Sequence, residues 1–396
     1  MGTEDKAGNR RRHHYPVAVG EDGHYIIHFD IIIMFQYKKI AVKVGSNVLT
    51  RKDGTLNITR MSALVDQIAE LRRCGISVVL VSSGAVASGR SEVKPDKKLD
   101  AISARQLYSA VGQAKLINRY YELFREHDIP CGQILTTKEN FSTRRHYLNQ
   151  RHCMNVMLEN GVIPIVNEND AVSVTELMFT DNDELSGLIA AMMDLDALVI
   201  LSNVDGIYNG DPAIPESEVI REIVGAKQDV SSCIQTGKSQ FGRGGMLTKC
   251  SIAQKVADEG VAVIIANGTR DNILPDVLKD GSDVVCTRFL PSQKPVSNVK
   301  KWIAHSEGFA KGEVYVNAGA REALLQPKAT SVLFIGVTRI EGDFEKDDIV
   351  KILDDAGVQI GVGCVGYDSN EARKRIGKRS NKPLVHYDYL YLDGGN

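Results

Sequence analysis

Short, continuously apolar runs alternate along most of the sequence with segments in which apolar residues recur every three or four positions. Strands that are apolar throughout are buried on both faces, and their alternation with helices is typical of a parallel sheet. We therefore predict an α/β domain with an open, mostly parallel sheet sandwiched by helices. The expected strands are 38–44, 76–81, 131–135, 162–166, 195–201 and 261–265, and the expected helices include 101–126, 147–159, 183–193 and 246–259. A further helix is expected between Thr59, as its N-cap, and Gly75, which closes it.

The pattern changes after Pro291, where a polar stretch is followed by short β-type runs separated by turn signals. This pattern predicts a small β-barrel-like domain. Its expected strands are 313–316, 331–334, 337–340, 349–352 and 358–362. We divide the chain into an N-terminal extension (1–36), disordered or non-native, the α/β domain (37–292), a linker (293–309) and the β domain (310–391).

Composition excludes several classes of protein. The 43% of hydrophobic and 25% of charged residues are ordinary for a soluble globular chain. A formal net charge of −2 gives no overall attraction to nucleic acid or to an anionic membrane. The seven cysteines form no metal-binding or CxxC spacing, which favours free thiols in a reducing compartment. We therefore expect a cytoplasmic protein without a membrane span.

Carboxylates and asparagines gather after the expected strand 162–166. Asn167-Glu168-Asn169-Asp170 follows that strand, and Thr180-Asp181-Asn182-Asp183 opens the next helix. Ligands in open α/β sheets bind beyond the carboxyl ends of the strands. The alternative is a solvated acidic loop with helix caps, because Asx residues favour turns and N-caps. The number of carboxylates favours a ligand site for the cluster as a whole, with Glu168 and Asp181 expected to be loop and cap residues.

Three further features lie within or after other expected strands. Lys43 lies inside an apolar strand and needs an anionic partner there, unless it reaches solvent at the sheet edge. Ser83-Gly84-Ala85 forms a strand-to-helix turn whose N–H groups can hold a carboxylate or phosphate. Gly242-Arg243-Gly244-Gly245 is a glycine-rich loop that leads into a helix carrying Lys249. Together with the acidic cluster, these features suggest phosphoryl transfer, which depends on positioning and charge neutralisation.

Two sequence motifs resemble known nucleotide-binding motifs but do not predict nucleotide binding here. Gly237-Lys238-Ser239 ends like a phosphate-binding P-loop, but no apolar strand precedes it. The segment 361–366 matches GxGxxG, yet too few residues follow for a dinucleotide-binding fold, and we expect glycines at a bend between strands.

Five stretches of the chain resemble the glutamate 5-kinase family of the amino acid kinase superfamily. The resemblance covers about residues 37 to 390, and the C-terminal domain is similar to a PUA domain. The Ser-Gly-Ala turn and the Asn-Glu-Asn-Asp string are specific to this family among its relatives. The stretches are Lys43–Asn47, Val81–Arg90, Asn167–Val172, Asp181–Ser186 and Gly244–Lys249.

The resemblance implies an amino acid kinase-like fold and ATP-dependent phosphorylation of the γ-carboxylate of L-glutamate, the first step of proline biosynthesis. Lys43 and Lys249 would flank the transferred phosphoryl group, and Asp183 would hold both lysines. Asp170 would receive the substrate ammonium. The other residues implied for glutamate binding are Ser83, Gly84, Ala85, Asn167 and Asn182.

The resemblance also implies an ATP site and its metal. Magnesium would be held by phosphate oxygens and water, with no protein ligand. Two positions depart from the family pattern: Ser202-Asn203 replaces Thr-Asp, and Arg243, which either contacts phosphate or faces solvent, replaces Thr. The residues implied for ATP are Lys43, Gly45, Ser202, Asn203, Arg243, Gly244, Gly245, Met246, Leu247, Thr248 and Lys249.

The family further implies inhibition by proline and a homo-oligomer, a dimer or a tetramer. PUA domains elsewhere bind RNA, but residues 311–390 hold 12 Lys or Arg against 12 Asp or Glu, a poor electrostatic footprint for RNA. The basic run 371–379 is expected to be a solvated helix face. Two alternatives stay open: a kinase of another small carboxylate, and an RNA-binding protein that acts through its C-terminal domain.

Overall fold

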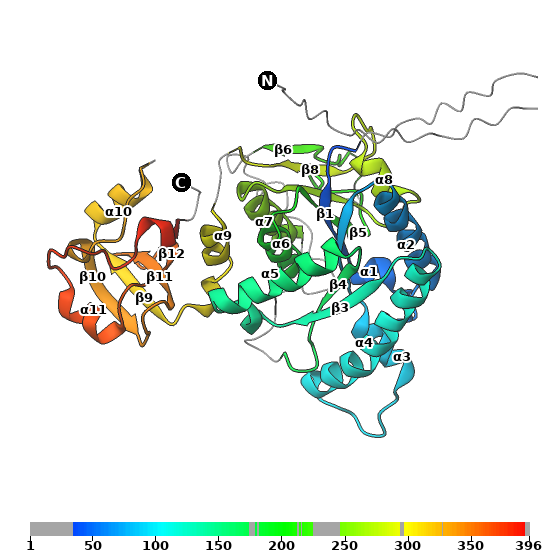
Figure 1. The fold of residues 1–396 in the computed structure, drawn as a ribbon, viewed down its shortest axis with the longest axis horizontal. Helices are drawn as coiled ribbons and strands as arrows, with labels where there is room; N and C mark the ends of the chain where they lie inside the picture. Colours follow the sequence, from blue (N-terminus) through cyan, green and yellow to red (C-terminus); the bar gives the residue numbers. More distant parts are fainter. Residues whose placement is uncertain are drawn as a thin grey trace, which may run out of the picture. The chain divides into compact units, whose positions relative to one another are not determined.

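The computed structural model describes residues 35–173, 179, 182–211, 214, 216–224, 246–293, 297–326 and 328–392. All of them belong to one compact unit that begins at Phe35. They form two sheets, one in an α/β domain and one in a smaller C-terminal domain (Figure 1). Among the described residues, no helix has both the length and the apolar character needed to cross a membrane.

The larger sheet has eight strands in the order β3-β4-β2-β1-β5-β7-β8-β6. Neighbouring strands run parallel, except that β8 is antiparallel to β7. The prediction of a mostly parallel sheet is therefore confirmed. The strands are β1 (Lys39–Val44), β2 (Ser77–Val81), β3 (Cys131–Thr136), β4 (Ile163–Glu168), β5 (Ala197–Ser202), β6 (Glu222–Val224), β7 (Ala262–Asn267) and β8 (Thr287–Leu290).

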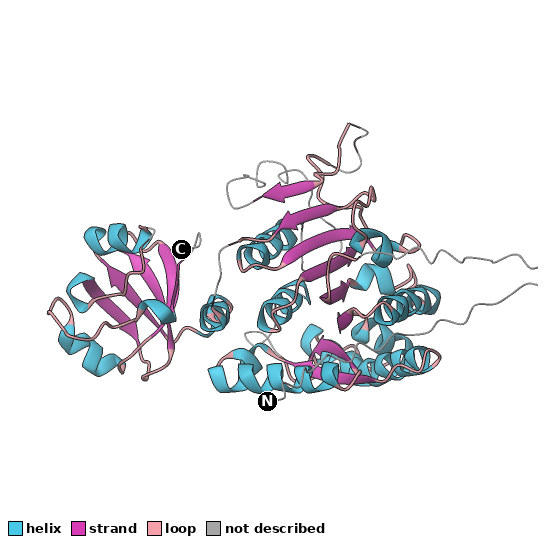
Figure 2. Ribbon diagram, turned by 45° about the horizontal axis from the view of Figure 1, so that its top comes forward, coloured by secondary structure: helices cyan, strands magenta, loops and turns pink. Residues whose placement is uncertain are grey.

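Helices cover both faces of this sheet (Figure 2). One core contains side chains of α2, α4 and α8, and the other contains side chains of α5, α6 and α7. In β1, Ile40 and Val42 belong to the first core and Ala41 to the second, so apolar residues are required on both faces of the strand. The helices are α1 (Ser46–Leu49), α2 (Ile58–Arg73), α3 (Ala85–Glu92), α4 (Ala101–Arg125), α5 (Arg144–Glu159), α6 (Asn182–Met192), α7 (Met246–Asp258) and α8 (Ile273–Leu278).

Several element boundaries differ from the prediction. Asn57, not Thr59, caps α2, because the Asn57 side chain accepts a hydrogen bond from the Arg60 N–H. Strand β4 continues through Asn167 and Glu168, which we had placed in a loop. Both side chains are buried despite their polarity. The sequence analysis missed β6 and β8, which have only three and four residues.

Helices α3 and α4 are in backbone contact through two glycines. A Cβ atom at Gly89 would lie 1.8 Å from the Tyr108 carbonyl oxygen, and one at Gly112 would lie 1.8 Å from the Ala85 carbonyl oxygen. No side chain fits at either position. This contact fixes α4 against the turn that connects β2 to α3.

The smaller sheet has the order β10-β9-β11-β12-β13, and only the pair β9–β11 is parallel. The run 331–334 is not a strand as predicted: Val332 forms an isolated bridge with Val385, and a 3-10 turn begins at Phe334. Its elements are β9 (Gly312–Val316), α10 (Ala318–Leu325), β10 (Val337–Gly342), β11 (Ile349–Asp354), β12 (Gln359–Cys364), α11 (Ser369–Arg375) and β13 (Leu390–Leu392). The glycines of the GxGxxG motif let β12 and β13 approach closely. A Cβ atom at Gly361 would lie 2.3 Å from the Tyr391 carbonyl oxygen.

The stretch 293–309, which we predicted to be a linker, contains α9 (Asn298–Ala304). The Ser297 side chain caps this helix by accepting a hydrogen bond from the Lys300 N–H. Trp302 is buried and donates its indole N–H to the Phe141 carbonyl at 3.0 Å. This segment is therefore packed structure that is bonded to the α/β domain.

Candidate active site

Two lysines meet on one buried carboxylate. Lys43 comes from β1, Lys249 lies one turn into α7, and Asp183 lies in the first turn of α6. Lys43 Nζ is 2.5 Å from Asp183 Oδ1, and Lys249 Nζ is 2.8 Å from Asp183 Oδ2. The Asp183 side chain is only 1% exposed. Lys43 therefore finds its anionic partner inside the protein and does not extend to solvent.

The charge state of this group follows from its surroundings. Burial acts to raise the pKa of Asp183, but the ammonium groups of Lys43 and Lys249 outweigh it and hold the pKa below its ordinary value. The carboxylate is thus ionised at neutral pH, and the group as a whole carries one excess positive charge. Such a group attracts phosphate oxygens.

Asn182 joins the ends of two strands, β2 and β4. Its Nδ2 donates to the Ser82 carbonyl oxygen at 2.8 Å and lies 3.0 Å from both Ser83 Oγ and Asn167 Oδ1. Because Asn182 is the first residue of α6 and Asp183 the second, one helix N-terminus presents an amide to the β2–α3 turn and a carboxylate to the lysines. The residues predicted to bind glutamate therefore lie beside those predicted to bind phosphate.

The β2–α3 turn depends on Gly84. This residue has φ +100°, in the left-handed region, and it is the N-cap of α3. A Cβ atom there would also lie 3.1 Å from Leu56 Cδ2. The turn leaves the Ser83 hydroxyl and the N–H groups of α3's first turn at the carboxyl end of β2, where an anion can bind.

A second ionic group has the opposite balance of charge. Arg105 of α4 donates from Nε to Asp170 Oδ1 at 2.8 Å, and its Nη2 contacts both Asp170 Oδ1 and Glu168 Oε2. Glu168 also accepts hydrogen bonds from the Ser173 hydroxyl and the Phe179 N–H. Two carboxylates thus surround one guanidinium. Our interpretation of Glu168 as a simple loop residue was wrong, because its carboxylate is buried and holds the chain that follows β4.

The pKa of Glu168 lies above its ordinary value. Burial is the main cause, and the nearby carboxylate of Asp170 adds to it. The Arg105 guanidinium and the hydrogen bonds from Ser173 and Phe179 act in the other direction but do not reverse the shift. The group around Arg105 thus combines one cation with two acidic side chains, whereas the group around Asp183 combines one anion with two cations.

The predicted ATP-binding residues are described only in part. Gly45 donates its N–H to the Leu201 carbonyl at 3.1 Å, which places it beside Ser202 at the end of β5. A Cβ atom at Gly45 would lie 3.1 Å from the Leu201 carbonyl oxygen, so glycine allows this close approach to the end of β5. Asn203 follows Ser202, and Met246, Leu247, Thr248 and Lys249 form the first turn of α7. Arg243, Gly244, Gly245 and Asp181 lie outside the described residues.

Two side chains that contact the site were not predicted from the sequence. Arg105 binds Asp170 and Glu168, and Gln113 Oε1 accepts a hydrogen bond from Asn167 Nδ2 at 2.9 Å. Both lie on α4 and reach the site because Gly89 and Gly112 bring α3 and α4 into contact. The small residues at these positions were the only available signal, and they identify a close helix contact without naming its functional consequence.

Among the described residues, no group of three or more His, Cys, Asp or Glu side chains could hold a metal ion. Asp183, the buried carboxylate nearest the lysines, is already neutralised by them. The donor set fits a metal that arrives with a nucleotide, held by phosphate oxygens and water.

Comparison with models of protein families shows to which class of protein the chain belongs. A model of the amino acid kinase family matches residues 38–267, which is more than half of the chain, and a model of the PUA domain matches residues 312–387. Among solved structures, UMP kinase from Bacillus anthracis is 16% identical with a TM-score of 0.45, and the match covers 64% of this chain and 96% of that one. The two family models show that the first domain is an amino acid kinase domain and the second a PUA domain.

Curated relatives show to which family within this class the chain belongs. Glutamate 5-kinase from Bacteroides thetaiotaomicron is 69% identical over 358 residues, which cover 90% of this chain and 99% of the relative. Glutamate 5-kinase from Chlorobaculum tepidum is 47% identical over 357 residues, covering 90% of this chain and 98% of the relative. The chain belongs to the glutamate 5-kinase family.

Proposed function

We propose that this protein transfers the γ-phosphoryl group of ATP to the γ-carboxylate of L-glutamate, giving L-glutamyl 5-phosphate and ADP, and so begins proline biosynthesis. The observation that carries the proposal is the Lys43–Asp183–Lys249 group with Asn182 and Ser83 beside it. Its place at the carboxyl ends of the strands, and relatives that are named glutamate 5-kinase, support it.

The reaction needs charge neutralisation more than proton transfer. The attacking γ-carboxylate is already ionised at neutral pH, so no general base is required. Lys43 and Lys249 flank the phosphoryl group and stabilise the charge that develops on its oxygens. Asp183 acts as a positioning residue, because its lowered pKa keeps it an anion that holds both ammonium groups.

Glutamate binds through two sets of groups. Ser83 and the N–H groups of Gly84 and Ala85 receive a carboxylate, with Asn182 and Asn167 alongside. Asp170 receives the ammonium. Because Asp170 and Glu168 share one Arg105, two acidic side chains lie against one cation, which suits a substrate ammonium. Arg105 therefore positions Asp170 without neutralising the site.

ATP binds along Gly45, Ser202, Asn203 and the residues from Arg243 to Lys249. Magnesium arrives with ATP and supplies charge neutralisation on the phosphates. Proline carries an ammonium and a carboxylate with the spacing of the α-groups of glutamate, so we propose that it inhibits by competing for the glutamate site. We further propose a homo-oligomer, a dimer or tetramer, in the cytoplasm.

A coupled assay of ADP release tests the proposal. The purified chain is given MgATP with L-glutamate, aspartate, acetylglutamate, carbamate or UMP as acceptor. We expect glutamate to give the highest kcat/KM and millimolar proline to raise the apparent KM for glutamate. Turnover with another small carboxylate but not with glutamate would assign the alternative kinase activity, and no turnover with any acceptor would overturn the kinase proposal.

A further inference from the structure

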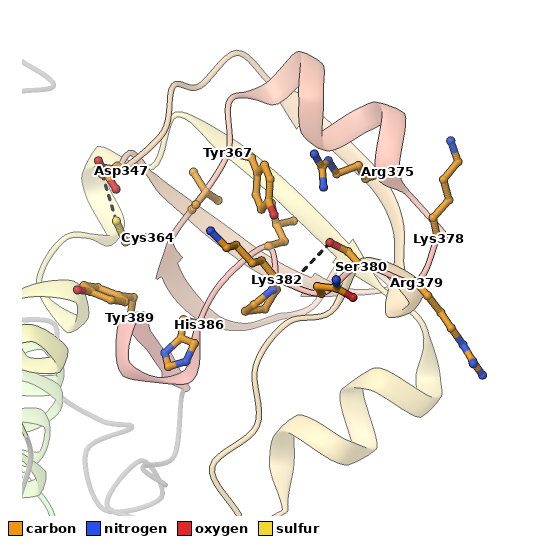
Figure 3. Close-up of a pocket in the computed structure, with 15 residues that line it drawn as sticks. Asp347, Cys364, Tyr367, Arg375, Lys378, Arg379, Ser380, Lys382, His386 and Tyr389 are labelled. Carbon is orange, nitrogen blue, oxygen red and sulfur yellow. Dashed lines mark hydrogen bonds between the residues drawn. The ribbon is translucent and has the colours of Figure 1, made fainter.

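The PUA domain contains a cavity of about 1000 Å³ (Figure 3). It lies between the end of β12 and the segment 375–389, which leaves α11 and returns towards β13. Pockets of several hundred to about 1000 Å³ are typical of sites for small molecules. None of the residues that line it belongs to the kinase site.

Basic side chains dominate the cavity. Four of them line it against the single carboxylate of Asp347: Arg375, Lys378, Arg379 and Lys382. In Figure 3, Arg375 and Lys382 point towards the interior, whereas Lys378 and Arg379 extend outwards at the rim. Residues 311–390 as a whole carry equal numbers of basic and acidic residues. Positive charge is therefore concentrated at this cavity.

The two inner cations differ in their partners. Arg375 forms an ion pair with Glu371 and lies over the Tyr367 ring, 4.7 Å from its centroid. Tyr367 in turn packs edge-on against Phe334. Arg375 is thus held in place before any ligand binds. Lys382 forms no ion pair with any residue that the structure describes, so its ammonium remains available to an anion.

Our interpretation of the basic run as a solvated helix face holds only in part, because Lys374, Lys378 and Arg379 are exposed but the run is helical only as far as Arg375. Helix α11 ends at Arg375, and Lys378 and Arg379 lie beyond it. The chain then turns so that Lys382 also lines the cavity, and in Figure 3 the Tyr367 ring lies between Lys382 and Arg375. The run therefore forms one wall of a concave site.

We propose that this cavity binds a small phosphorylated molecule, whose phosphate group contacts the Lys382 ammonium. Four basic groups against the carboxylates of Asp347 and Glu371 leave positive charge in excess, which favours a multiply charged anion over a simple carboxylate. A phosphate would occupy only part of the cavity, which leaves space for an organic group beside Tyr389. RNA is less suited, because a long polyanion requires a continuous basic track and the domain carries no net positive charge.

Calorimetric titration with inorganic pyrophosphate at low salt tests the proposal. The full-length chain carries Lys249→Ala in every arm, so that binding at the kinase site is weakened equally. We expect Lys382→Gln to reduce the affinity about tenfold, because an ionic hydrogen bond is lost. The matched control Lys374→Gln removes the same charge at an exposed residue of the neighbouring basic run, outside the cavity, and we expect it to leave the affinity within about twofold.

Three results would overturn the proposal. The first is no pyrophosphate binding to the Lys249→Ala chain, and the second is an equal effect of Lys382→Gln and Lys374→Gln. The third is displacement of pyrophosphate by a single-stranded oligonucleotide that itself binds far more tightly, which would assign the cavity to RNA. Equal thermal unfolding midpoints of the variants show that lost binding does not reflect lost folding.

Discussion

The two ionic groups at the carboxyl edge of the large sheet have opposite compositions. At Asp183 one carboxylate lies between two ammonium groups, and at Arg105 one guanidinium lies between two carboxylates. The first group combines two cations with one anion, and the second combines two acidic side chains with one cation. The comparison suits the proposed roles, in which the first group binds a phosphate and the second binds an ammonium.

The pKa shifts of the two groups also have opposite signs. The lowered pKa of Asp183 contributes stability that is present at neutral pH and is lost as pH falls through the folded-state pKa. The raised pKa of Glu168 has the reverse effect, because the folded protein holds this proton more tightly than the unfolded chain. Its ionisation therefore reduces stability as pH rises. Arg105 limits that loss.

The largest expected effect comes from removing the charge of Asp183. In Asp183→Asn the lysines lose their anion, repel each other and leave their positions. We expect kcat to fall on the order of 10²- to 10³-fold, as when one electrostatic contact to a transition state is removed, with little change in KM for glutamate. Steady-state kinetics of ADP release measures this.

Glu184→Gln is the matched control for that variant. It neutralises the next residue of α6, whose carboxylate pairs with Lys138 at 3.2 Å in a more exposed position. We expect less than about a fivefold change in kcat. Equal losses in the two variants would show that Asp183 has no special role among the acids of this helix.

Removing the charge of Asp170 affects the other group. We expect Asp170→Asn to raise KM for glutamate about 10- to 100-fold, because an ionic hydrogen bond to the substrate ammonium is lost, with a smaller change in kcat. The measurement is a glutamate titration at saturating ATP. A fall in kcat without a rise in KM would move Asp170 from substrate binding to the chemical step.

The sequence predicted one of these groups and not the other, for a physical reason. Lys43 lies in a strand that is apolar on both faces, so a buried cation that needs an anion could be inferred from its neighbours. Arg105 lies on an amphipathic helix among other polar residues, where an arginine normally faces solvent. Only the tertiary contact at Gly89 and Gly112, which no local pattern encodes, brings it to Asp170.

The same reason explains which parts of the fold were predictable. Long apolar strands and periodic helices follow from local pattern, and the mostly parallel sheet follows from their alternation. The polar end of β4 does not, because Asn167 and Glu168 form strand pairs with β3 while their side chains serve the site. Strands β6 and β8 are too short to produce a pattern.

Removal of Arg105 tests whether the second group depends on its single cation. In Arg105→Gln two close carboxylates lose their partner, so the pKa of Glu168 should rise further. We expect KM for glutamate to increase about tenfold, because Asp170 is no longer held in place. The unfolding midpoint should fall further below that of the wild type as pH rises from about 5 to about 8. A midpoint difference that is constant across this range would contradict the ionic explanation.

The smallest expected effect concerns the neutral bond that connects α4 to the glutamate site. Gln113 accepts from Asn167, and Asn167 Oδ1 in turn accepts from Asn182 and from the Glu168 N–H. We expect Gln113→Met, which keeps a similar volume, to raise KM for glutamate about two- to tenfold, the effect of one neutral hydrogen bond, and to leave KM for ATP unchanged. Because this bond carries no net charge, the change should not depend on pH or salt, in contrast to Arg105→Gln. An effect of Gln113→Met that varies with pH in the same way would show that α4 acts on the site as one rigid body and not through separate ionic and neutral contacts.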